Sequence, residues 1–169
     1  MTGLLIHLVL WLFVINLGIA FGAGLYESRI VIPQWLRYSV ESGYQWDADA
    51  AREANTGLRF WVYATTVPLT LLTLLSLGAA FWFQGGVRGW WLGAALAALV
   101  DRSMTFAYFI PTMLRLTGDE RISQPQAAAT ALQWVRLGHV RHAATLVAWL
   151  AALKAFALLA ASSLDAGGP

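Results

Sequence analysis

Long apolar runs alternate with shorter polar connections along this chain. A helix needs about 20 mostly apolar residues to cross the hydrocarbon core of a bilayer, and four runs reach that length, at residues 4–25, 60–83, 90–113 and 137–164. A turn at residues 84–88 joins the second and third runs tightly. The pattern predicts an all-α fold, in which residues 1–169 form a single integral membrane domain, an antiparallel four-helix bundle.

The two longer connections, residues 26–58 and 114–136, fall on the side opposite both termini. The first run is interpreted as a retained helix, since it lacks the basic flank and the cleavage site of a signal peptide. Arginines gather on the side of the long connections, at Arg29, Arg37, Arg52, Arg59, Arg115, Arg121 and Arg136. Basic residues favour the inner face of a membrane, so the pattern predicts a multi-pass protein of the cell membrane with both long connections in the cytoplasm.

The few polar residues in the runs are spaced as one face of a helix. Offsets of four and three keep side chains on one face, and lipid is expected to turn that face inward. These stripes are Asn16, Ala20, Ala23 and Glu27 in the first run, Arg59, Tyr63, Thr66, Thr70 and Thr73 in the second, Asp101, Thr105, Tyr108, Thr112 and Arg115 in the third, and His139, His142 and Thr145 in the fourth.

The alternating direction of the runs determines which polar residues can meet. Glu27, Arg59, Arg115, His139 and His142 all fall near the end that carries the long connections. Three aromatic residues are expected at similar depth, namely Tyr26, Tyr108 and Trp134. His7 is expected at the opposite end of the bundle, about 30 Å away. A candidate site is therefore predicted near the long connections.

Asp101 and Arg102 lie deep in the third run, ~16 Å along the helix from Trp90. Ionisable groups at such depth indicate a functional site by default, although a structural polar cluster with Asn16 and the threonines is an alternative. Neighbouring positions on a helix point about 100° apart, so the two side chains are not expected to face each other. Arg102 then needs another acceptor, either a bound anion or Asp101 reached by bending around the helix.

Composition and charge narrow the partners. Apolar residues make up 59% of the chain and charged residues 12%, so lipid is the expected solvent. The net charge of +2 is small and scattered, which gives no support for nucleic acid binding. The chain has no cysteine, which excludes disulfides and thiolate chemistry. The expected partners are the lipid bilayer and a small hydrophobic ligand, and a homo-oligomer is compatible with the pattern.

Several stretches resemble the anthrone oxygenase-like family of small four-span membrane proteins. They are RSMTFAYFIPTMLRL at residues 102–116, followed by Trp134, Arg136 and HVRHAA, then GLYESRIVIPQW with Glu27 and Trp35, and RFWVYATTVP in the second run. The resemblance implies a four-helix fold and the oxidation of polyketide anthrones to anthraquinones with no metal or flavin cofactor. It implies no role for any individual residue.

The residues themselves suggest how an anthrone-like substrate would react. Proton removal from such a flat, weakly acidic ketone needs a base that titrates near neutrality and a cation for the developing oxyanion. The candidate catalytic residues are His139, His142 and Asp101. The candidate substrate-binding residues are Arg59, Arg102 and Arg115 for the oxyanion, Tyr26, Tyr108 and Trp134 as an aromatic slot, and Glu27 and Asn16 as further polar contacts.

Two other functions remain open on sequence. His139, His142 and Glu27 lie at one depth and suggest a metal or haem redox subunit. A ligand carrier or an accessory subunit without catalysis is equally compatible with four spans. The chain has no nucleophile elbow, phosphate loop or metalloprotease motif, so the soluble hydrolase classes have no support.

Overall fold

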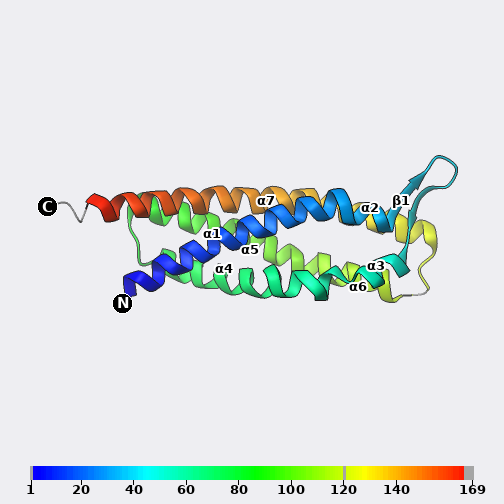
Figure 1. The fold of residues 1–169 in the computed structure, drawn as a ribbon, viewed down its shortest axis with the longest axis horizontal. Helices are drawn as coiled ribbons and strands as arrows, with labels where there is room; N and C mark the ends of the chain where they lie inside the picture. The colour runs from blue at the N-terminus through cyan, green and yellow to red at the C-terminus, as the bar shows by residue number, and fades with distance from the viewer. Residues whose placement is uncertain (1, 120, 166–169) are drawn as a thin grey trace.

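The computed structural model describes residues 2–119 and 121–165 of the chain. Within these residues, four helices are long and apolar enough to cross a membrane, namely Leu4–Trp35, Gly57–Ala80, Gly85–Gly118 and Gln124–Ser162. They run alongside one another in an elongated bundle, with the N- and C-terminal ends at one end and a β-hairpin at the other (Figure 1). The all-α prediction is confirmed, and each span except the second extends well beyond its predicted bounds.

Three of the spans combine α-helical and π-helical segments. In chain order the elements are α1 (Thr2–Tyr26), η1 (Glu27–Val31), α2 (Ile32–Trp35), β1 (Leu36–Ser39), β2 (Gly43–Trp46), α3 (Ala48–Ala54), η2 (Gly57–Thr66), α4 (Val67–Ala80), α5 (Gly85–Met104), η3 (Thr105–Phe109), α6 (Ile110–Gly118) and α7 (Gln124–Asp165), where η marks a π-helical segment.

Each of these π-helical segments is followed, after one intervening residue, by a proline. Pro33, Pro68 and Pro111 occupy the first turn of α2, α4 and α6. A proline ring supplies no N–H and crowds the carbonyl one turn earlier, so the α-helical hydrogen-bond ladder is interrupted at these points. In all three places the interruption takes the form of a wider π turn, a feature common at functional sites.

The interruption at Pro68 is compensated by a neighbouring helix. In an α-helix the carbonyl of Ala64 would accept from the N–H of residue 68, which proline lacks. Asn16 of α1 donates its Nδ2 to that carbonyl oxygen at 2.8 Å. Because an unsatisfied backbone group is costly in an apolar setting, this bond ties α1 to the junction of η2 and α4.

The π turn in η2 also changes which residues face inward. The predicted stripe placed Arg59 and Tyr63 inside, and this is wrong: Arg59 is exposed and Tyr63 is 76% exposed. Thr65, which is 1% exposed, takes the buried position instead. A π turn holds more residues than an α turn, so offsets of four and three no longer return to the same face.

Much of the two long connections is helix or strand. Residues 26–35 continue the first helix, and a two-stranded antiparallel hairpin pairs Leu36 with Trp46. The hairpin is anchored by Trp46, whose Nε1 donates to the carbonyl of Leu116 at 3.0 Å and whose carbonyl accepts from Gln124 Nε2 at 2.9 Å. The second connection shortens to a few residues, because α6 continues to Gly118 and α7 begins at Gln124.

Two hydrophobic cores fill the bundle. The core near the termini includes Leu10, Phe13, Leu69 and Trp91, together with alanines of α5 and α7 that pack these two helices closely. Small side chains allow such close approach of membrane helices. The core near the hairpin is rich in aromatic residues, including Trp35, Trp46, Phe109 and Trp134. The buried charges lie between these cores.

Replacement of Asn16 tests the bond to the proline break. Asn16→Ala leaves the Ala64 carbonyl unsatisfied, and we expect a loss of about 1–3 kcal/mol in the free energy of unfolding in detergent. In a Pro68→Ala background the restored N–H can take over that carbonyl, so the same replacement should cost less. An equal cost in both backgrounds, measured as a double-mutant cycle, would contradict the compensation.

Candidate functional site

Asp101 and Arg102 form a buried ion pair in the middle of the bundle. Asp101 is 2% and Arg102 7% exposed. The Nε of Arg102 donates to Asp101 Oδ2 at 2.8 Å, and its Nη2 donates to the same oxygen. The sequence left two acceptors open for Arg102, a bound anion or Asp101, and the structure shows Asp101. Their Cβ atoms diverge, but the long arginine side chain bends back around the helix to the nearest carboxylate.

Asp101 also holds two residues of α7. Thr145 Oγ1 donates to Asp101 Oδ1 at 3.3 Å, and Arg141 Nε lies 3.9 Å from the same oxygen. The guanidinium of Arg141 stacks 4.3 Å from the centre of the Phe109 ring, which adds a cation–π contact. One carboxylate thus links α5 to α7 through one arginine and one threonine.

Glu27 provides the second buried carboxylate, from the start of η1. Its Oε1 accepts from Trp61 Nε1 at 2.8 Å and from Thr56 Oγ1 at 3.3 Å, and the charge of Arg141 also acts on it. Two carboxylates and two guanidinium groups therefore offset one another. With neutral histidine, this cluster carries no net charge.

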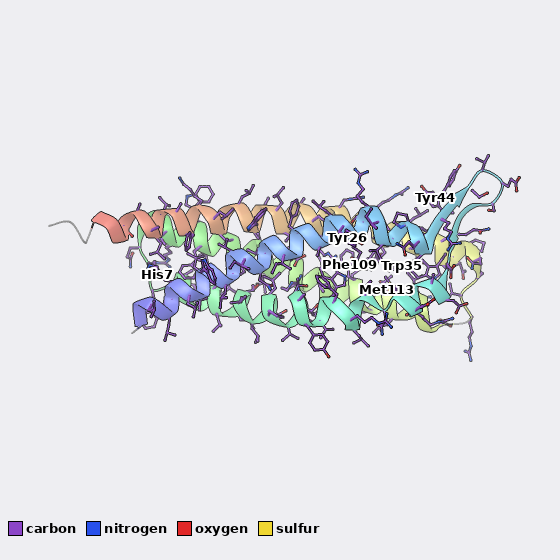
Figure 2. The ribbon with its side chains drawn as sticks, in the orientation of Figure 1. His7, Tyr26, Trp35, Tyr44, Phe109 and Met113 are labelled. Carbon is purple, nitrogen blue, oxygen red and sulfur yellow. The ribbon has the colours of Figure 1, made fainter. Side chains whose placement is uncertain are left out.

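A cavity of about 550 Å³ opens beside this cluster, between η2 on one side and η3 and α6 on the other. Its deep end is lined by Asp101, Arg102 and Arg141. Four aromatic residues also line the cavity, namely Trp35, Trp61, Phe109 and Trp134. Figure 2 shows Trp35, Phe109 and Met113 in the half of the bundle near the hairpin, far from His7. The volume is in the range of sites for small molecules.

His142 lines the cavity and rests on a glycine of the first helix. An added Cβ at Gly24 would lie 2.5 Å from His142 Nε2, closer than packing allows, so only glycine leaves room for the imidazole there. At Gly22, two positions earlier, an added Cβ meets nothing within 4 Å. The Nε2 of His142 has no hydrogen-bond partner among the described residues.

The structure brings some of the predicted site residues together and separates others. Those that line the cavity are Glu27, Asp101, Arg102, Trp134 and His142. Those outside it are the exposed Arg59, Arg115, Tyr26 and His139, the half-buried Tyr108, and Asn16, whose side chain donates to the Ala64 carbonyl. Arg59 lies within η2, Arg115 lies beyond η3, His139 lies on an exposed face of α7, and Tyr26 is the last residue of α1.

Sequence reasoning missed the residues that complete the cluster. Arg141 joins both carboxylates, although it was overlooked between His139 and His142 in the segment HVRH. Its signal was available, since it precedes Thr145 by one helical turn and is the cation of that run nearest the depth of Asp101. Trp61 has no such signal, because its direction depends on the π turn around it.

The metal interpretation finds no matching geometry. The described residues hold no group of three or more His, Cys, Asp or Glu side chains that could bind a metal ion. His139 and His142 are neighbours on α7, with ring centres 6.4 Å apart, but His139 is exposed while His142 lines the cavity. Comparisons with known protein families, with curated protein sequences and with solved structures find no match to this chain.

Removal of the Asp101 carboxylate should destabilise the bundle. Asp101→Ala leaves two buried guanidinium groups with one carboxylate, and breaking a buried pair in this way costs about 3–5 kcal/mol. Asp49→Ala is the matched control, because the ion pair of Asp49 with Arg52 is exposed and should contribute little. Thermal unfolding in detergent measures both, and similar midpoints for the two variants would contradict the role of Asp101.

The contact of Gly24 with His142 gives a second test. We expect Gly24→Ala to lose about 1–3 kcal/mol through overpacking and to shift the NMR signals of the His142 imidazole, assigned with a His142→Ala sample. Gly22→Ala should leave those signals unchanged. If both alanine variants behave alike, the packing of His142 on Gly24 does not set the position of the imidazole.

Proposed function

We propose that this chain is a membrane-embedded enzyme that oxidises a small hydrophobic aromatic substrate without a cofactor, similar to the anthrone oxygenase-like family. The observation that carries the proposal is that His142, Arg102 and several aromatic residues line the same cavity. The four apolar spans support a location in the cell membrane, with the hairpin end in the cytoplasm as the arginine distribution favours.

His142 is the proposed general base. It is the one of the two predicted histidines that lines the cavity, whereas His139 is exposed. A neutral imidazole can accept a proton on its unprotonated ring nitrogen, and the Nε2 atom has no hydrogen-bond partner among the described residues. This nitrogen, which packs against Gly24 in the structure, is the proposed proton acceptor.

Arg102 is the proposed partner for the substrate oxygen. Two of its nitrogens bind Asp101, while Nη1 is buried and has no hydrogen-bond partner among the described residues. A cation fixed in a dry site stabilises a developing oxyanion without the cost of reorganising solvent. The neighbouring Trp35, Phe109 and Trp134 offer faces against which a flat substrate can stack.

The reaction follows from these roles. The base removes one benzylic proton from the anthrone, which gives its enolate anion, the anthranolate. This anion passes an electron to dioxygen. The resulting anthrone radical and superoxide then join in a C–O bond. Return of a proton gives a hydroperoxide. Loss of the second benzylic proton then breaks the O–O bond, so that the carbon becomes a carbonyl and one oxygen atom leaves as water. The substrate is oxidised and dioxygen is reduced, in a ratio of one to one.

Oxygen uptake with anthrone tests the proposal. We expect His142→Ala to lower the rate by about 100-fold or more, the usual contribution of a general base. His139→Ala, one turn away on the same helix, is the control and should retain the rate. A protein that binds anthrone saturably but consumes no oxygen would be a ligand carrier instead. Loss of activity in Glu27→Gln but not in His142→Ala would assign the base to Glu27.

A further inference from the structure

The cavity has one flank that is apolar and exposed. Of the residues that line it, Leu58 is 64%, Leu114 is 66% and Ile110 is 37% exposed. Leu58 lies at the start of η2, and the other two lie on α6, so the exposed side chains face each other across the opening. All three belong to helices that are long and apolar enough to cross a membrane.

The opening follows from the way the second and third spans separate. Near the turn at residues 81–84 the two spans are packed together through α4 and α5. Towards the hairpin, η2 packs against α1 instead, while α6 contacts α3 and α7. The spans therefore diverge with distance from the turn, and the cavity fills the angle between them.

Helix α3 and the residues after it bound the hairpin end of the cavity, where the lining residues Arg52 and Asn55 are exposed. Helix α3 packs against α6, and Arg52 Nη1 donates to the carbonyl of Thr117 at 2.6 Å across this end. Trp46 bonds the carbonyl of Leu116 next to it. Trp46 on β2 and Arg52 on α3 both lie outside the four apolar spans.

The deep end offers one free donor in a neutral setting. Arg102 Nη1 is buried without a partner among the described residues, and Arg102 is 7% exposed and lines the cavity. The surrounding charges already balance, so a fully charged ligand would leave an uncompensated charge in an apolar site, which is costly. An uncharged oxygen acceptor meets both conditions.

We propose that the ligand enters the cavity sideways from the bilayer, between η2 and α6. The ligand is an uncharged, flat or elongated apolar molecule dissolved in lipid, with a carbonyl or phenol oxygen at its leading end. That oxygen accepts from Arg102 Nη1, and the apolar remainder lies along Leu58, Ile110 and Leu114. This inference rests on the proposed function for its choice of probe, anthrone, and concerns access and binding alone.

A reversible plug at the opening tests the route. The chain has no cysteine, so Leu114→Cys places a single thiol at the opening, and a benzyl methanethiosulfonate attaches a bulky group that a reductant removes. Leu74→Cys is the matched control, since Leu74 is also exposed, at 56%, but lies on α4 outside the cavity. Anthrone binding in vesicles is followed by saturable quenching of tryptophan fluorescence.

The expected result is specific to the opening. The plug on Leu114→Cys should slow quenching by about tenfold or more, since access limits the association rate, and the reductant should restore it. The plug on Leu74→Cys should have no effect. Anthraquinone-2-sulfonate, which is flat but charged, should not compete with anthrone.

Two results would overturn the inference. One is equal quenching by anthrone with and without the plug on Leu114→Cys, and the other is the absence of saturable quenching in the unmodified protein. Oxygen uptake on the same samples separates this inference from the proposed function. Plug-sensitive binding without oxygen uptake refutes the oxidase alone, whereas oxygen uptake that ignores the plug refutes the lateral route alone.

Discussion

The carboxylate of Asp101 is the interaction on which the bundle depends. A buried charge in an apolar setting persists only when opposite charge and hydrogen bonds surround it. Arg102 on its own helix and Arg141 on α7 supply that charge, and Thr145 supplies a further hydrogen bond. The cluster therefore fixes the register of α5 against α7, the two helices whose small residues also pack most closely.

The three prolines explain why a cavity exists beside this cluster. Each follows a π turn, and these turns carry Glu27, Trp61 and Phe109, all of which line the cavity. A regular α-helix would keep the second and third spans packed along their whole length. The wider turns redirect the helices and rotate aromatic and acidic side chains towards the space that opens. The carbonyl of Ala64, to which Pro68 cannot donate, accepts a hydrogen bond from the side chain of Asn16 instead.

The sequence alone predicts the spans and most inward faces where the helices are regular. His139 on α7 is an exception, because it is exposed. In the first-run stripe Asn16, Ala20 and Glu27 are buried and Ala23 is half-buried, because α-helical geometry holds up to the start of η1. The prediction fails for Arg59 and Tyr63, where a π turn changes the period. For Arg102 the spacing left two acceptors open, and the long side chain reaches Asp101 although the Cβ atoms diverge. The hairpin was also missed, since its few paired residues carry no strong alternating pattern. The prolines after each π turn were visible, but no spacing rule converts a proline into a turn of known width.

The balance of charge decides what kind of molecule the cavity can accept. With Arg102 alone, the deep end would favour an anion, which crosses an apolar opening poorly. Glu27 and Asp101 offset Arg102 and Arg141, so the guanidinium keeps its directional N–H donor while the site loses its preference for full negative charge. A neutral acceptor that gains charge only as it reacts is then stabilised at the moment its oxygen becomes negative. The same cluster that stabilises the helix pair thus leaves one donor, Arg102 Nη1, for the oxygen of the proposed lipid-soluble ketone.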